Sequence, residues 1–172
     1  MESKFIKISI YICLQYFKKK IKKMKSYLSI FFIAFLLVSC SNDDTSFEPQ
    51  TEADIIKYIA DNNLDAKKTS SGLYYVINKE GTGPRPANSS ANVTVIYKGY
   101  FLNGRVFDEN KSGYTTNLNQ VIAGWTEGIQ LFKEKGEGIL LIPSNLGYGP
   151  NGRGSIPGGA VLVFDITLKS VN

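Results

Sequence analysis

The segment from residue 160 to residue 171 alternates its side chains with a period of two. Successive side chains of a β-strand point to opposite faces, so a strand over this segment carries a wholly apolar face. That face consists of Leu162, Phe164, Ile166 and Leu168, and the opposite face carries Val161, Val163, Asp165, Thr167 and Lys169. Because an apolar sheet face must be covered by another layer, the rest of the domain has to supply that cover.

Three further segments indicate strands. Residues 73–77 and 93–98 are rich in β-branched and aromatic residues, and residues 138–142 form a continuous apolar run. Asn103-Gly104 predicts a two-residue hairpin turn of type I′, in which both residues have positive φ. The only good candidate for that cover is residues 125–133, whose spacing suits a short amphipathic helix with Trp125, Ile129 and Phe132 on one side. The expected fold class is α+β, with a twisted antiparallel sheet wrapped around one short α-helix over residues 73–172.

A second, shorter helix and a linker are expected over residues 51–72. Thr51 and Asp54 have the spacing of a capping box, and Ile55, Ile56 and Ile59 form a narrow apolar face. We expect this helix to lie on the surface without a specific structural or functional role. Docking on the domain and a role in dimerisation are the alternatives.

The positive charge of the chain is confined to its N-terminal part. The net charge is +5, and residues 1–39 contribute +7 through eight lysines and one glutamate, which leaves −2 for residues 40–172. A domain that binds nucleic acid usually carries a basic face or stripe. Nucleic acid is therefore not an expected partner.

Residues 1–39 have the pattern of a signal peptide. Lysines flank Met24, and an apolar run at residues 27–38 follows. That run is shorter than the roughly 20 residues needed to span a bilayer, and it ends in small residues, as signal peptides do. Met24 is the expected true start, and a long basic region that begins at Met1 is the alternative.

The end of this segment, Leu37-Val38-Ser39-Cys40, resembles the lipobox of bacterial lipoproteins. The resemblance implies a lipid on Cys40 and a membrane-anchored protein in the cell envelope. Ser41 favours the outer membrane, on its periplasmic face or at the cell surface. An ordinary signal peptide with a chance cysteine and an uncleaved anchor are the alternatives. Residues 40–50 are polar and acidic and suit a flexible tether, although a surface-export signal fits them equally well.

Cysteine and histidine usage limits the chemistry. The only cysteines are Cys13 and Cys40, and the chain has no histidine. Zinc sites and Ser-His-Asp or Cys-His catalysis need these residues. We therefore expect no metal and no cofactor.

Several blocks between residues 73 and 172 resemble, in the same order, those of the FKBP-type peptidyl-prolyl cis/trans isomerases. They are Val95-Ile96-Tyr97-Lys98-Gly99, Gly104-Arg105-Val106-Phe107-Asp108, the run from Gln120 to Gly128, Ile142-Pro143, Gly147-Tyr148-Gly149, Ile156-Pro157 and Leu162-Val163-Phe164-Asp165. The resemblance implies isomerisation of X–Pro peptide bonds in proline-containing polypeptides, assistance to the folding of exported proteins, and inhibition by macrolides. A low-activity chaperone or protein-binding module with the same fold is the alternative.

The chemistry of such a reaction explains the kind of site to look for. Rotation about a peptide bond has a barrier of about 18–20 kcal/mol because the C–N bond is partly double. No bond is broken, so neither a nucleophile nor a metal is required. The twisted amide is less polar than the planar one, so an apolar pocket with a few fixed polar groups favours it.

The resemblance assigns roles to ten residues. Asp108, Tyr97 and Tyr148 would be catalytic: Asp108 orients Tyr97 and presents a carboxylate near the twisting carbonyl, and Tyr148 offers its hydroxyl from a flap loop, residues 147–159. Asp108 is not expected to act as a general acid. The substrate-binding residues would be Phe107, Tyr114, Val121, Ile122, Trp125, Ile156 and Phe164, with Trp125 as the floor and the Ile122 N–H as a donor. Taken singly, Trp125, Phe107, Phe164 and Tyr97 are more typical of a core, and Asp108 could be a turn residue. Only their joint occurrence in the family pattern favours a role in the site.

Two departures from the family pattern affect specificity. The arginine that pairs with the pocket aspartate in some members has no clear counterpart, and Lys111 is the nearest candidate. Pro157-Gly158-Gly159 replaces a common double-proline turn, which predicts a more mobile flap loop.

Overall fold

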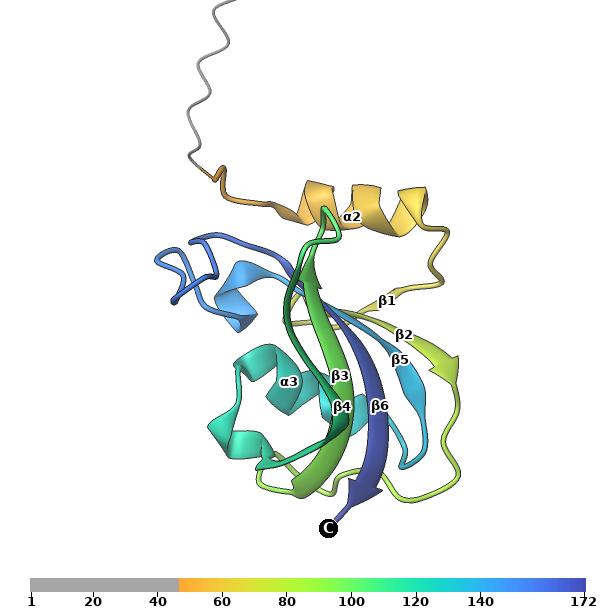
Figure 1. Cartoon of the computed structure of the whole chain (residues 1–172). Helices are drawn as coiled ribbons and strands as arrows, with labels where there is room; N and C mark the ends of the chain where they lie inside the picture. Colours follow the sequence, from red (N-terminus) through yellow and green to blue (C-terminus); the bar gives the residue numbers. More distant parts are fainter. Residues whose placement is uncertain (1–46) are drawn as a thin grey trace, which may run out of the picture. The chain divides into compact units, whose positions relative to one another are not determined.

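The computed structural model describes residues 47–172, which fall within one compact unit (Figure 1). The expected signal peptide, the start at Met24 and the lipidation of Cys40 lie outside the described residues. The elements are α2 Glu52–Asp61, β1 Lys67–Lys68, β2 Tyr74–Lys79, β3 Asn92–Phe101, β4 Val106–Asn117, α3 Ala123–Gly128, β5 Glu137–Ile142 and β6 Leu162–Val171, with 3₁₀ turns η1 Leu118–Gln120, η2 Ile129–Leu131 and η3 Ser144–Leu146. In this part of the chain no helix is long and apolar enough to cross a membrane.

One antiparallel sheet of six strands organises the domain, in the order β1-β2-β5-β6-β3-β4. The sheet bends around α3, as Figure 1 shows. The strand predicted over the C-terminal segment is β6, and it lies inside the sheet between β5 and β3. The α+β class with an antiparallel sheet around a short helix is thus confirmed.

The apolar face of β6 is covered as the alternation requires. Its four apolar residues are at most 5% exposed. They share one core with Trp125 from α3 and with Ile129 and Phe132 from the turn that follows. Burial of this face against the helix supplies the main hydrophobic stabilisation of the domain.

The core helix begins earlier and ends sooner than its sequence pattern predicts. It covers residues 123–128 and continues as a 3₁₀ turn, instead of running over 125–133. Two glycines explain its position. A Cβ at Gly124 would lie 2.5 Å from Ile142, and one at Gly128 would lie 2.7 Å from Leu140. The backbone of the helix therefore packs directly on β5.

The hairpin between β3 and β4 is present, but its predicted turn type is wrong. Gly104 has a φ of +82°, whereas Asn103 does not have positive φ. The Gly104 N–H donates to Phe101 O, and the Phe101 N–H donates to Arg105 O. The turn therefore spans residues 101–104 with glycine as its last residue, as in hairpins where a left-handed glycine closes the loop.

The hairpin signal at Asn103-Gly104 implies a strand after the turn, but the sequence of β4 lacks the alternation that would indicate its extent. Its twelve residues are almost all exposed or half-buried, and it forms an edge of the sheet. Edge strands tolerate charged and polar side chains on both faces. Its register against β3 shifts between Val95 and Tyr97, so a regular period of two is absent from the sequence as well.

Helix α2 packs on the domain. The expectation of a surface helix without a specific role is therefore wrong. Ile55 is fully buried in a second cluster with Tyr74, Leu141, Val161 and Val163. These residues lie on the face of the sheet opposite α3, which explains why Val163 on the second face of β6 and Val161 just before the strand are buried. The expected division at residue 73 therefore does not correspond to a boundary in the packing.

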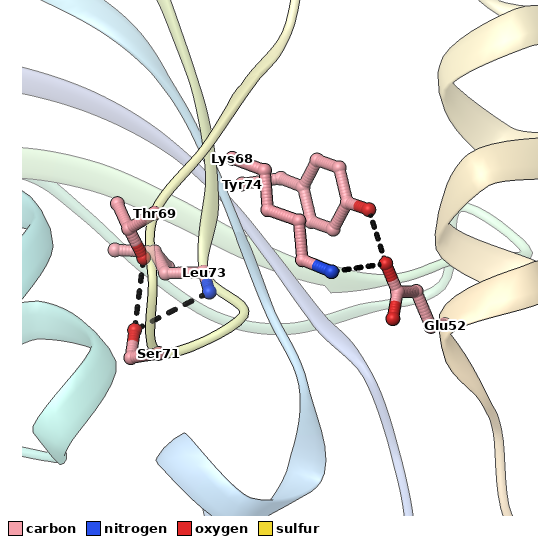
Figure 2. Close-up of polar contacts among 6 residues, drawn as sticks. All are labelled: Glu52, Lys68, Thr69, Ser71, Leu73 and Tyr74. Atoms are coloured by element: carbon pink, nitrogen blue, oxygen red, sulfur yellow. Dashed lines mark hydrogen bonds and ion pairs between the residues drawn. The ribbon is translucent and has the colours of Figure 1, made fainter.

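Polar contacts fix the start of α2 (Figure 2). Glu52 Oε1 accepts hydrogen bonds from Lys68 Nζ at 2.5 Å and from the Tyr74 hydroxyl at 2.6 Å. The Lys68 contact, with a smaller effect from Tyr74, lowers the pKa of Glu52. The Thr51 N–H donates to Asp54 Oδ2 at 2.7 Å, as the capping spacing predicts. The Thr51 hydroxyl donates to the same oxygen at 2.9 Å.

Two adjacent isoleucines of α2 provide a matched test of this docking. Ile55→Val is expected to lower the free energy of unfolding by about 0.5–1.5 kcal/mol, because it leaves a void in a buried cluster. Ile56→Val serves as the control, since Ile56 is 52% exposed. Urea unfolding of both variants measures the difference. Equal effects of the two substitutions would contradict the docked position of α2.

Candidate active site

One pocket of about 750 Å³ opens beside α3, and all ten residues singled out by sequence line it. They come from β3, β4, the turn between η1 and α3, α3, the flap loop and β6, so the fold brings together segments that are far apart in the chain. The pocket contains all three expected catalytic side chains and all seven expected substrate-binding residues: Tyr97, Asp108, Tyr148, Phe107, Tyr114, Val121, Ile122, Trp125, Ile156 and Phe164. Their roles in catalysis and binding stay predictions.

Aromatic rings form a connected group around Trp125 at the floor. The Trp125 ring lies edge-to-face with Tyr97 at 5.0 Å and with Phe164 at 5.3 Å between centroids. Phe164 in turn meets Phe107 edge-to-face at 5.5 Å. Each such pair stabilises the arrangement beyond simple burial. The rings therefore hold one another in fixed orientations instead of filling the space loosely.

Gly99 on β3 sets the position of the wall formed by Phe107 and Phe164. A Cβ at Gly99 would lie 2.7 Å from both aromatic rings, closer than carbon atoms can approach without displacement. Gly99 pairs with Phe164 on β6 and with Asp108 on β4. The missing side chain therefore makes room for two rings of the pocket at the point where three strands meet.

The principal polar contact of the pocket joins Tyr97 and Asp108. The Tyr97 hydroxyl donates to Asp108 Oδ2 at 2.7 Å. Burial, followed by this hydrogen bond, raises the pKa of Tyr97 above its usual value. The phenol therefore stays protonated and remains the donor. The carboxylate of Asp108 is held at the pocket by a residue from the neighbouring strand.

The chain between η1 and α3 presents Val121 and Ile122 to the pocket. The Thr126 hydroxyl donates to Leu118 O at 2.6 Å, which ties the start of η1 to the first turn of α3. Within residues 47–172 the Ile122 N–H has no acceptor, and it lies next to the first helical residue. It is thus available to a carbonyl group in the pocket.

Five further lining residues were not singled out as site residues: Gln120, Gly147, Arg153, Gly154 and Ser155. Arg153, Gly154 and Ser155 form the tip of the flap loop, where Arg153 and Ile156 exchange both backbone hydrogen bonds at 2.9 and 3.0 Å. Arg153 could have been predicted from the sequence, because it is a cation within the loop that the resemblance places over the pocket.

Lys111, the candidate partner for Asp108, does not line this pocket. Its Nζ lies 3.2 Å from Glu109 Oε2 on the same strand. Arg153 is the cation that the described residues place at the pocket instead. Across residues 47–172, no group of three or more histidine, cysteine, aspartate or glutamate side chains is placed to hold a metal ion.

A family model described as FKBP-type peptidyl-prolyl cis-trans isomerase matches residues 83–169. The FKBP-type isomerase FkpA of Buchnera aphidicola is 46% identical over 107 residues, which are 60% of this chain and 42% of that protein. A probable FkpA of Neisseria meningitidis is 48% identical over 109 residues, 61% of this chain and 40% of that protein. This chain thus matches about two fifths of the length of these relatives.

The comparison with solved structures leads to the same class of protein. A peptidyl-prolyl cis-trans isomerase of Pseudomonas syringae is similar with a TM-score of 0.63 and 30% identity, over 74% of this chain and 99% of that one. FkpA of Escherichia coli is similar with a TM-score of 0.64 and 27% identity, over 90% of this chain and 71% of that one.

Proposed function

Because this chain belongs to the FKBP-type peptidyl-prolyl cis-trans isomerase family, we propose that it isomerises X–Pro bonds in proline-containing polypeptides. The observation that carries the proposal is the pocket in which the aromatic floor and walls surround the Tyr97–Asp108 pair. Its volume of about 750 Å³ falls within the range of pockets that enclose a small organic group, and a prolyl ring is such a group.

The twisted amide is the species that this pocket favours. Twisting removes amide resonance and makes the group less polar than its planar form. Trp125, Phe164 and Phe107 offer the prolyl ring an apolar surface, and water is excluded from the face that packs on them. The barrier falls when these contacts are stronger for the twisted form than for the planar one.

Three polar groups orient the substrate in this mechanism. The Ile122 N–H and the Tyr148 hydroxyl hold carbonyl groups on either side of the twisting bond. The Asp108 carboxylate, held by Tyr97, lies near the carbonyl carbon, where it interacts with the charge distribution of the rotating amide. No proton is transferred and no covalent intermediate forms, so the catalytic effect comes from positioning and electrostatics.

The proposed biological setting is the cell envelope. The lipobox-like sequence before Cys40 supports a lipid anchor there, and the exported proteins that fold nearby would be its clients. Mass spectrometry of the mature N-terminus tests this part separately. A lipid-modified Cys40 at the mature N-terminus is the expected result, and an intact residue 1 or an unmodified cysteine would contradict the anchor.

A protease-coupled assay on short X–Pro peptides tests the activity. Purified full-length protein is expected to accelerate cis-to-trans conversion, and a macrolide that occupies FKBP pockets is expected to inhibit it. If the protein shows no acceleration across a panel of residues before proline, the proposal fails. A double variant, Asp108→Ala with Tyr148→Phe, that still assists protein refolding would favour the binding-module alternative.

A further inference from the structure

The flap loop, residues 147–159, supplies two fifths of the residues that line the pocket, yet it is held by few contacts. It contributes Tyr148, Ile156 and the tip residues between them. The tip is a closed hairpin through the two hydrogen bonds between Arg153 and Ile156. Gly158 is so close to Pro150 that a Cβ would lie 2.0 Å from its carbonyl oxygen. Since the loop packs on itself, its orientation over the pocket depends on how its base is fixed.

The base of the flap loop closes at Gly159. The Gly159 N–H donates to Gly149 O at 3.0 Å, which joins the two ends of the loop. Gly159 has a φ of +78°, and it follows another glycine. Glycine adopts many conformations, so neither of these two residues restrains the base of the loop through a side chain of its own. A contact from outside the loop is therefore needed to fix its direction.

Gln50, which precedes helix α2, makes that contact through its backbone N–H and through its side chain. Its N–H donates to Gly159 O at 3.0 Å, and its side-chain oxygen Oε1 accepts a hydrogen bond from the Val161 N–H at 2.8 Å. In a parallel sheet one residue donates to and accepts from two residues that flank its partner. Gln50 reproduces this pattern around Ala160, with a side-chain carbonyl in place of a backbone carbonyl.

The neighbours of Gln50 hold this contact in place. Pro49 packs so closely on Gly159 that a Cβ there would lie 2.6 Å from Pro49 Cβ. On the other side, helix α2 is anchored by buried Ile55, which shares a cluster with Val161. The segment that was expected to be a free tether is thus fixed at Gln50, between a docked helix and the root of the flap loop.

We propose that Gln50 is a positioning residue for the proposed isomerase reaction: it fixes the base of the flap loop and so keeps Tyr148 and Ile156 over the pocket. The inference rests on the proposed function for its kinetic consequence, but its structural part stands without it. Gln50 itself touches no substrate. Its effect reaches the pocket through Gly159 and Val161, where the flap loop joins β6.

Gln50→Ala removes the acceptor of the Val161 N–H, which is buried because Val161 is only 1% exposed. The expected result is a rise of about threefold to tenfold in KM, the factor that corresponds to one ordinary hydrogen bond, with kcat changed less than about twofold. Amide hydrogen exchange at Val161 and in the flap loop should accelerate by a similar factor. Exchange in β3 should stay unchanged.

Two variants separate positioning from general damage. Gln50→Glu keeps an oxygen that can accept the Val161 N–H, and it should restore most of the wild-type KM and exchange protection. Asn62→Ala is the matched control: it removes a side-chain amide at the far end of α2, whose hydrogen bond goes to Tyr58 O at 2.8 Å. This control should leave KM and the exchange of the flap loop unchanged.

The inference is overturned if Gln50→Ala leaves KM and the exchange rate of Val161 unchanged. It is also overturned if exchange accelerates equally in β3, since the effect would then be global. If wild-type protein shows no isomerase activity, the proposed function fails, while the exchange of the flap loop in the same three variants still decides whether Gln50 positions it.

Discussion

Asp108→Ala is expected to lower kcat/KM for an X–Pro peptide by about tenfold to hundredfold while the protein stays folded. A hydrogen bond to a charged group contributes about 1.5–3 kcal/mol, and each 1.4 kcal/mol that is lost from the transition state corresponds to about tenfold in rate. The substitution removes both the carboxylate and the acceptor of the Tyr97 hydroxyl. The protease-coupled assay measures the loss.

The domain contains a matched control for this variant. On the other face of the sheet, the Tyr100 hydroxyl donates to Asp165 Oδ1 at 2.9 Å, so the same pair of residue types is joined by the same contact. Asp165→Ala should leave kcat/KM within about twofold of the wild-type value, because Asp165 does not line the pocket. Equal losses in both variants would show that the effect is structural.

A double-mutant cycle assigns the role of the carboxylate more sharply. If Asp108 acts by orienting Tyr97, the losses from Asp108→Ala and Tyr97→Phe should not add, because each substitution breaks the same contact. Asp108→Asn retains an acceptor for the Tyr97 hydroxyl and removes the charge. Activity of this variant close to that of the wild type would contradict a direct electrostatic role and leave orientation as the whole effect.

Gly99→Ala is expected to lower kcat/KM by about tenfold or more and the free energy of unfolding by about 1–3 kcal/mol, the usual cost of overpacking a core. The new methyl group would have to displace the rings of Phe107 and Phe164, and a displacement of about 1 Å at a positioned site can greatly reduce activity. Peptide kinetics and urea unfolding of the same preparation measure both effects.

Gly104→Ala provides the comparison. A Cβ at Gly104 meets no atom within 4 Å, but the residue has a φ of +82°, so alanine there costs backbone strain of roughly 1–2 kcal/mol. This variant should lose stability to a similar extent and keep its activity. If both variants lose activity in parallel with stability, Gly99 has no special role in the pocket.

The sheet and its helix were predictable because burial imposes periodicity on the residues that form them. The alternation in β6 requires a cover, and Trp125, Ile129 and Phe132 supply one. Strand β4 lies at an edge with both faces largely exposed, so burial imposes no pattern there. The start of α3 depends on the close approach of Gly124 and Gly128 to β5, which a helical spacing of apolar residues does not reveal.

The pocket residues could be predicted only from the family resemblance. Taken singly, each of them fits a core or turn position without any role in a site. What the sequence could not provide was the link between α2 and the flap loop. Gln50 and Val161 are 111 positions apart and joined by one side-chain hydrogen bond. Such a contact leaves no local pattern. The docked position of α2 likewise depends on Ile55 rather than on Ile56. The sequence pattern places both residues on the same apolar face and does not show which of them is buried.

Exchange spectroscopy by NMR on an X–Pro peptide, with the protein at about one hundredth of the peptide concentration, tests catalysis most directly. Uncatalysed exchange takes tens of seconds or longer. The expected result is faster exchange in both directions by the same factor, with the cis fraction unchanged, because a catalyst lowers the barrier without altering the equilibrium. Unchanged exchange rates, or a cis fraction that shifts only at stoichiometric protein, would contradict catalysis and indicate a binding module instead.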